Sequence, residues 1–420
     1  MQKFKVLILT ILVILGFAFP SFAATQVDAL IEKLVEKGIL TKSESLELKE
    51  EIASDEKLMR EDGFKQSLPE WVQNTKLKGD MRVRYQYERS ESSTEARSRG
   101  RIRYRLGLES IVNPEVKVGA GLATGAEDPR ATNVTMEDVF EKPDIRLDYA
   151  YGEYKPEHTT WFKTIVGKFP SKDYLWAPSD VLWDTDINPN GVSVNLTHQF
   201  MASTEGYFNG GVWVLEDNST VDRPDPFMTY AQSGVNWKEG KLGAKAATTL
   251  YTFNGLKGTD QDHDSTTNTR EAGGGLKYDF DSIGGSAEVS LQKPFEAFED
   301  IIPIPIQSFA VFSDYIHNFD PNDNANGWSL GARTGDEKVV GKGQWQFKYI
   351  FARLGKDAWP DFLPDSDRLG GGTDIRAHEV AFDLGLNRNV ILGLDYYQGR
   401  KIVGAKDINH LYQVDLNFKF

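Results

Sequence analysis

The chain has 420 residues, a formal net charge of −14 and no cysteine. The lack of cysteine excludes disulfides and thiolate metal sites, and the acidic balance argues against general nucleic-acid binding. The mean hydropathy of −0.44, with 38 glycines, suits either soluble domains or a membrane β-barrel, because only alternate residues of a barrel strand face lipid.

Residues 1–24 have the features of a signal peptide. Lys3 and Lys5 form a basic start, an apolar run follows over 6–19, and the small residues Ser21 and Ala23 have the spacing of a cleavage site. No later segment is apolar for long enough to form a transmembrane helix. The mature protein is therefore predicted to be exported, and any membrane crossing must be made by strands.

Residues 25–70 are predicted to form an N-terminal helical, coiled-coil-like segment and a linker in the periplasm. Val27, Leu30, Ile31 and Leu34 lie on one helical stripe, and Thr41 begins a capping box for a second helix. The stripe requires a partner surface, which favours self-association or cell-wall contact through 25–60. The alternative is a solvated helical hairpin.

From residue 76 the apolar period changes from 3.6 to 2. Apolar and polar side chains alternate over 77–87, 99–109, 116–123 and 145–151, and again over 378–386, 390–397 and 412–420. Strands of about ten residues are typical of an outer-membrane barrel, whereas strands of a soluble β-sandwich are usually shorter. The sequence therefore predicts an all-β, antiparallel transmembrane barrel over 71–420.

About seventeen candidate strands can be counted between 76 and 420. Since single-chain bacterial barrels have an even number, we expect 16 strands, with 18 as the alternative. Glycine and proline blur the alternation over 254–326, where the surplus candidate is expected. Tyrosines near strand ends are expected at the membrane–water girdle; they are Tyr85 with Tyr87, Tyr149 with Tyr151, and Tyr396 with Tyr397.

Arginine alternates with apolar residues in the segment RGRIRYRLGL, residues 99–108. Because lipid penalises arginine by several kcal/mol, these side chains are predicted to face water inside the barrel. Neighbouring strands place further arginines on the same face, so we expect a basic, pore-lining wall of Arg82, Arg84, Arg101, Arg103, Arg105 and Arg146. Alternatively, these arginines only pair with nearby Asp80, Glu109, Asp148 and Glu153 along the wall.

Residues 169–190 form a long segment without a strand pattern, and loops of this length are usually functional. They contain three prolines, Trp176 and Trp183, together with the candidate constriction residues Asp173, Asp180, Asp184 and Asp186.

Several of these segments resemble the bacterial putative-porin family and, more broadly, the general porins. They are LIEKLVEKGILTKSESLEL after the signal peptide, the arginine-alternating strand, DIRLDYAYGEYKP, VGKFPSKDYLWAPSDVLWDTDINPNGVSV at 166–194, and the terminal strand ending in Phe420. The resemblance implies that loop 169–190 folds inward and narrows the lumen, that Phe420 is a signal for the barrel-assembly machinery, and that the protein is a homotrimer in outer-membrane lipids. The alternative for the loop is an external one packed on its own aromatics.

The sequence thus favours a passive outer-membrane porin for small hydrophilic solutes and ions, with no cofactor and no metal. The alternatives are a structural barrel that tethers the membrane to the cell wall and an anion- or phosphate-selective channel. Catalysis is not expected, because the six histidines are isolated and none lies in a GxSxG or HExxH context. The stretch DQDHD lacks the spacing of an EF-hand.

Overall fold

The computed structural model describes residues 70–218, 225–296 and 306–420. The predicted signal peptide and helices of 25–60 lie outside these residues. The chain divides into two units after Gln73, and the second unit, Asn74–Phe420, is the one described below. The four-residue helix α4 (Glu70–Gln73) precedes it, and no helix among the described residues is long and apolar enough to cross a membrane.

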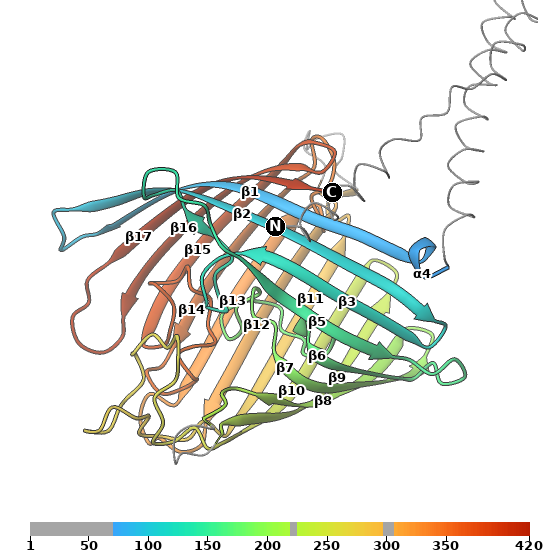
Figure 1. Cartoon of the computed structure of the whole chain (residues 1–420), viewed down its shortest axis with the longest axis horizontal. Coiled ribbons are helices and arrows are strands. Elements are labelled where there is room, and N and C mark those ends of the chain that lie inside the picture. Colours follow the sequence, from blue (N-terminus) through green and yellow to red (C-terminus); the bar gives the residue numbers. More distant parts are fainter. Residues whose placement is uncertain (1–69, 219–224, 297–305) are drawn as a thin grey trace, which may run out of the picture. The chain divides into compact units, whose positions relative to one another are not determined.

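The second unit is an antiparallel β-barrel (Figure 1). Each strand pairs with its neighbours in the chain, and β1 pairs with β17 from Asp80↔Lys419 to Ser90↔Asn409, which closes the sheet. The strands are β1 (Thr75–Ser90), β2 (Ala96–Asn113), β3 (Val116–Thr124), β4 (Val134–Thr135), β5 (Ile145–Tyr154), β6 (Phe162–Lys168), β7 (Asn190–Met201), β8 (Thr204–Val214), β9 (Phe227–Glu239), β10 (Leu242–Asn254), β11 (Ser282–Gln292), β12 (Ser308–Asn318), β13 (Asn326–Gly335), β14 (Trp345–Leu354), β15 (Ile375–Asn387), β16 (Val390–Lys401) and β17 (Asn409–Lys419).

Sixteen of these strands form the wall, which confirms the predicted number. The two-residue β4 pairs only with Arg101 and Ile102 of β2, beyond the end of the shorter β3, and is not a separate wall strand. The wall strands in 254–326 are β11 and β12, preceded by a long loop over 255–281.

The two ends of the barrel differ in the length of their connections. One end has tight turns such as 114–115, 202–203, 240–241 and 388–389, and the other has long loops such as 125–144, 169–189, 255–281 and 355–374. Outer-membrane barrels carry short turns on the periplasmic side and longer loops outside. We therefore call the long-loop end the external end.

An aromatic core lies inside the barrel and is centred on β8, β9 and β10, with further members from β5, β6 and β15. Inward side chains of β8, β9 and β10 pack against loops 169–189, 255–281 and 355–374, with Trp183 5.4 Å from Trp213 and 5.6 Å from Trp359 between ring centres. Burial of this apolar surface holds the three loops against the inner wall.

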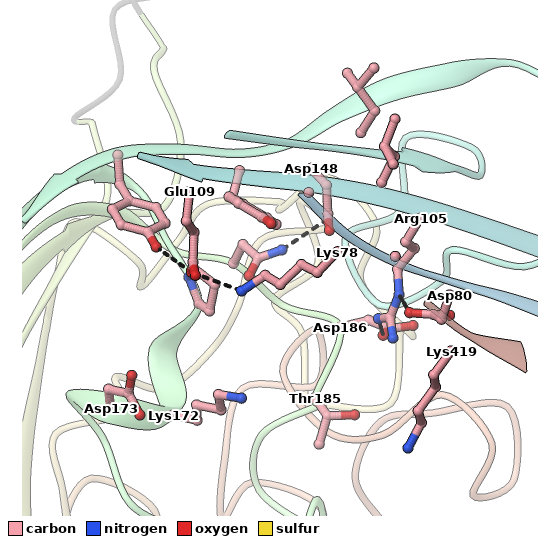
Figure 2. A pocket seen from close by; sticks show the side chains of 18 of the residues that line it. Lys78, Asp80, Arg105, Glu109, Asp148, Lys172, Asp173, Thr185, Asp186 and Lys419 are labelled. Atoms are coloured by element: carbon pink, nitrogen blue, oxygen red, sulfur yellow. Dashed lines mark hydrogen bonds and ion pairs between the residues drawn. The ribbon is translucent and has the colours of Figure 1, made fainter. Parts of the chain in front are cut away.

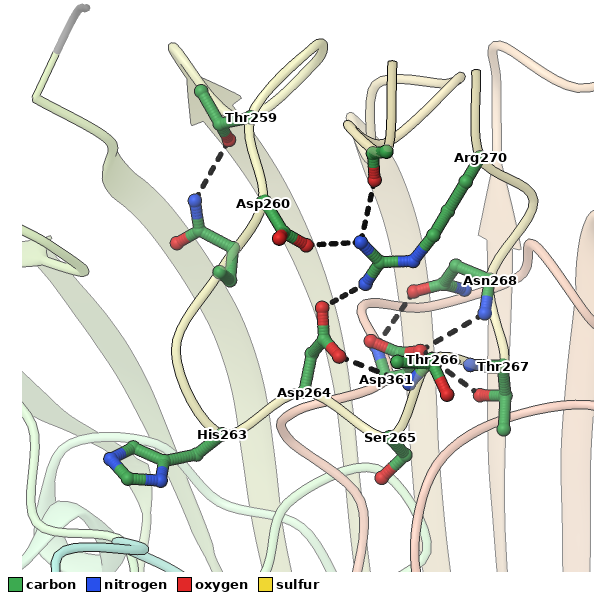
Figure 3. A network of polar contacts seen from close by, with 12 residues as sticks. Thr259, Asp260, His263, Asp264, Ser265, Thr266, Thr267, Asn268, Arg270 and Asp361 are labelled. Carbon is green, nitrogen blue, oxygen red and sulfur yellow. Dashed lines mark hydrogen bonds and ion pairs between the residues drawn. The ribbon is translucent and has the colours of Figure 1, made fainter. Parts of the chain in front are cut away.

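Polar contacts join loop 255–281 to loop 355–374 (Figure 3). Asp361 accepts hydrogen bonds from the backbone N–H groups of Thr267 (2.6 Å) and Asn268 (3.0 Å). Arg270 forms ion pairs with Asp260 and Asp264, so two of the three aspartates in the stretch DQDHD are paired with an arginine from their own loop.

Three of the six predicted girdle positions are wrong, and two of them lie on β5. A bulge between β3 and β5 pairs Leu147 with Leu122 but Tyr149 with Gly121, and the one-residue shift turns the tyrosines of β5 inward. The Tyr151 hydroxyl donates to the Glu109 carboxylate at 3.0 Å. Gly121 leaves room for the Tyr149 ring, which lies where a Cβ atom would stand.

The third wrong position is Tyr397, because the pair Tyr396 and Tyr397 divides between the two faces of the wall. Adjacent residues of a strand point to opposite sides, so Tyr396 and Tyr397 cannot both face lipid. Tyr397 is buried inside, 5.7 Å from the guanidinium of Arg368, while Tyr396 packs on Tyr412 outside.

Candidate functional site

Five of the six predicted wall arginines lie together on the inner face of β1 and β2. Cross-strand pairing sets Arg82 opposite Arg103 and Arg84 opposite Arg101, with Arg105 next along β2. Their outward neighbours, including Val83, Ile102 and Tyr104, form the opposite face, as the alternation predicts.

Arg146 lies apart from this group. It belongs to β5, also on the inner face, but its guanidinium lies 3.4 Å from Glu127 and 3.2 Å from Asp144 in the loop before β5. It lines a separate cavity of about 490 Å³ with Asp148 and Asp186.

Carboxylates of the barrel wall neutralise most of the arginines. Arg84 makes a two-pronged pair with Asp415 at 2.7 and 2.8 Å, a geometry that the guanidinium fork favours. Asp80 accepts from Arg103 at 2.8 Å and from Arg105 at 2.8 Å. The alternative drawn from the sequence, in which the arginines pair with acids along the wall, therefore holds at Asp80.

The other carboxylates named in that alternative have different partners. Glu109 pairs with Lys78 at 2.8 Å, and Glu153 pairs with Lys117 at 2.9 Å. Asp148 accepts a hydrogen bond from the Asn188 side chain at 2.9 Å. Asp415, which sequence reasoning did not name, is brought to Arg84 by closure of the barrel across 331 residues.

Loop 169–189, which joins β6 to β7, contacts inner-face residues from several parts of the wall. The Trp176 N–H donates to Gln232 of β9 at 2.9 Å, and the Ser179 hydroxyl donates to Asp314 of β12. Asp186 lies 3.2 Å from Arg105 of β2. Contacts to both β2 and β12 place this loop across the barrel interior, beside the aromatic core.

The four predicted aspartates of this loop have different surroundings. Asp186 contacts the arginine wall, since it accepts from Arg105 and from Thr132 at 3.0 Å. Asp180 pairs with Arg368 at 2.7 Å, and Asp173 lines a cavity together with its neighbours Lys172 and Tyr174.

Asp184, the fourth, is buried and accepts backbone N–H groups of Asp186 at 2.9 Å and Ser366 at 3.1 Å. Burial raises the pKa of Asp184 to about 8, although the N–H group donated by Asp186 acts in the opposite direction.

Arg368 of loop 355–374 is a buried residue that sequence reasoning missed. Its guanidinium pairs with Asp180, with Asp365 at 2.8 Å and with Glu379 of β15, and Glu379 also pairs with Lys348 of β14. This network ties loop 169–189 to the wall. Of its acidic members only Asp365 is near Arg368 in sequence, so no local motif signals it.

Two polar cavities lie on either side of loop 169–189. The larger, about 760 Å³, includes Lys78, Glu109, Lys172 and Lys419, and Figure 2 shows several of these side chains around one open space. The smaller, about 340 Å³, lies toward the external end. Both are lined by the same four residues, Arg82, Arg103, Thr185 and Asp186, which we call the neck.

The titration of Asp184 gives a pH-dependent prediction, because this residue lines the smaller cavity. With a raised pKa, its carboxyl is mostly neutral near pH 7 and gains a negative charge by about pH 9. Cation preference of the open barrel should therefore rise over this range, measured as the reversal potential in a KCl gradient. Because the folded-state pKa is raised, the stability that this group contributes is lost as pH rises toward 8.

The Asp184→Asn variant is the control for this effect. Asparagine keeps one acceptor for the backbone N–H groups but does not titrate. We expect the pH-dependent part of the reversal potential to shrink in this variant, and an identical pH profile in the two proteins would assign the titration to another group.

A scan against protein-family models decides the classification. The model described as Putative porin matches residues 87–282 and 304–420, which is most of the chain. The chain belongs to the putative-porin family. Its members are non-enzymatic channels of the outer membrane, which confirms the resemblance drawn from the sequence and the expectation of no catalysis.

The solved structure of OprB shares the fold of this porin. OprB of Pseudomonas putida, in its high-pH structure, is 11% identical, with a TM-score of 0.55, and the match covers 83% of this chain and 94% of OprB. A multiply substituted variant of the Rh. blastica porin is 12% identical, with a TM-score of 0.42 and coverage of 82% and 100%. A search of curated proteins found no match.

Proposed function

We propose that this porin is a water-filled channel for passive diffusion of small hydrophilic solutes and ions, narrowed at the neck. The observation that carries the proposal is the pair of polar cavities that share Arg82, Arg103, Thr185 and Asp186. A solute that moves along the polar side of the barrel passes between the arginines of β1 and β2 and the aspartate of loop 169–189.

Charge at the neck is the proposed basis of selectivity. Arginines stand on the wall and Asp186 stands on the loop, so a field runs across the path and orients dipolar solutes. The aromatic core fills the other side of the interior and restricts the path to the arginine side. Diffusion needs no cofactor.

Arg101 favours an anion-selective channel as the second candidate. Its guanidinium donates to Gln86 at 3.2 Å and to the Asn133 carbonyl at 3.1 Å, and among the described residues no carboxylate lies within ion-pair distance of it. The neighbouring arginines at 82, 84, 103 and 105 each have a carboxylate partner. An unpaired cation in the smaller cavity attracts anions.

Single-channel recording of the purified protein in a planar bilayer tests the channel proposal. We expect discrete conductance steps, with the sign of the reversal potential separating the general from the anion-selective channel. Absence of steps from correctly folded protein would leave the structural barrel, tethered to the cell wall through 25–60, as the function.

The remaining partners follow from the family and belong to the same proposal. Outer-membrane lipids surround the wall, and a homotrimer is proposed. The barrel-assembly machinery is proposed to read Phe420, whose backbone N–H donates to the Gly79 carbonyl at 3.0 Å beside β1. The signal peptide 1–24 and the periplasmic segment 25–70 complete the proposed organisation.

A further inference from the structure

Three arginines form a row on the outer face of the barrel near its external end. Arg353 of β14 pairs with Arg376 of β15, which pairs with Arg400 of β16. They alternate with buried inward residues such as Ala352 and Ala377, so the arginines stand on the face opposite the lumen.

These three guanidinium groups have no compensating charge in the described part of the chain. None of them forms an ion pair or a hydrogen bond with another described residue, and Arg376 only stacks over the Phe351 ring at 5.3 Å. Like charges placed directly opposite on neighbouring strands destabilise a sheet. An external anion at this row would remove that repulsion.

The position of the row relative to the membrane follows from a tyrosine row on the same face. Tyr396 and Tyr412 pack at 4.7 Å between ring centres, Tyr87 lies beside Tyr412, and Tyr349 is on β14. Tyrosines of this kind mark the membrane–water interface.

The arginines lie four residues farther along the strands than Tyr349 and Tyr396, toward the long loops. That spacing is about 13 Å along a strand and about 10 Å along the membrane normal after the strand tilt. The row therefore stands at the level of the lipid headgroups. Since the long loops mark the external end, the leaflet is the outer one.

A cavity of about 190 Å³ opens between the strands at this row. It is lined by Arg376, His378, Gln398, Arg400 and Ile408, which offer hydrogen-bond donors from β15 and β16. The planar guanidinium fork matches two oxygens of a phosphate group, and its charge is fixed at any physiological pH.

We propose that the row of Arg353, Arg376 and Arg400 binds the phosphate groups of an anionic lipid in the outer leaflet. The occupant is a membrane lipid because the row faces the bilayer at headgroup height and its charge is complementary to phosphate. This site is independent of conduction through the lumen, and it anchors the β14–β16 wall at the outer surface of the membrane.

Native mass spectrometry of the purified full-length protein in a non-ionic detergent tests the proposal. Diphosphoryl lipid A is the probe, with phosphatidylcholine as the lipid without net charge. The variant carries Arg353→Ser, Arg376→Ser and Arg400→Ser. Loss of three charge-assisted contacts should weaken binding of diphosphoryl lipid A by about tenfold or more, and leave phosphatidylcholine binding unchanged.

The matched control removes three arginines from the lumen instead, through Arg101→Ser, Arg103→Ser and Arg105→Ser. This variant should bind diphosphoryl lipid A as the unmodified protein does. The Arg376→Ser single variant, expected to give an intermediate loss, covers the case in which the outer triple variant fails to fold. Equal lipid affinity in the folded outer variants and the unmodified protein, or an equal loss in the lumen control, overturns the proposal.

Discussion

Replacement of Arg101, Arg103 and Arg105 by serine is expected to shift the ion selectivity of the channel strongly toward cations. Three positive charges leave one wall of the lumen, and two carboxylates lose their partners. Asp80 is paired with Arg103 and Arg105, and Asp186 with Arg105. Both acids then face the path as uncompensated negative charges.

The measurement is the reversal potential in a tenfold KCl gradient. A pore that passes only cations would give a reversal potential of about 59 mV in this gradient. The reversal potential of the variant should move toward that limit by an amount on the order of 10 mV or more. The matched control is the outer triple variant at Arg353, Arg376 and Arg400, which removes the same charge from the lipid face. If the two variants give the same reversal potential, the lumen arginines have no role in the ion selectivity of the channel.

Replacement of Arg368 by glutamine is expected to cause the largest loss of stability. The arginine is 2% exposed and holds Asp180, Asp365 and Glu379. Removal of one partner from a buried ionic network leaves charges without compensation and typically costs about 3–5 kcal/mol. Lys348 retains Glu379, so the cost falls mainly on the two aspartates.

Denaturant unfolding of the protein in vesicles of phosphatidylcholine, a lipid without net charge, measures this free energy. Loop 169–189 should also become more accessible, which is detected as faster trypsin cleavage after Lys172. Arg376→Gln is the matched control, because this arginine lies on β15 but has only a ring contact outside the barrel. A free energy of unfolding that changes equally little in both variants would show that the network does not hold the loop.

The sequence predicted the two faces of the wall where the strands are regular. Along β1 and β2 the five wall arginines point inward and residues such as Val83 and Ile102 point outward, because the pleat alternates with a fixed period of two residues. The same rule failed at Tyr149 and Tyr151. A bulge adds one residue to β5, and no local pattern in the sequence marks it.

Partner choice inside the lumen could not be predicted in the same way. The nearby acids considered for the arginines share their strands or the next ones, yet Arg84 is neutralised by Asp415 from the last strand. Similarly, Asp180 lies on the predicted loop but turns to Arg368, while Asp186 reaches Arg105. These choices depend on ring closure and on how loops 169–189 and 355–374 pack against each other.

The sequence by itself determined the barrel, the inward-facing arginines of β1 and β2 and the identity of the long acidic loop. Each of these follows from local periodicity or composition, which neighbouring residues express without reference to the rest of the chain. Only the tertiary structure decided the neck, the Arg368 network and the outer arginine row. These features join residues separated by up to hundreds of positions, and their contacts exist only after the sheet has closed and the loops have filled one side of its interior.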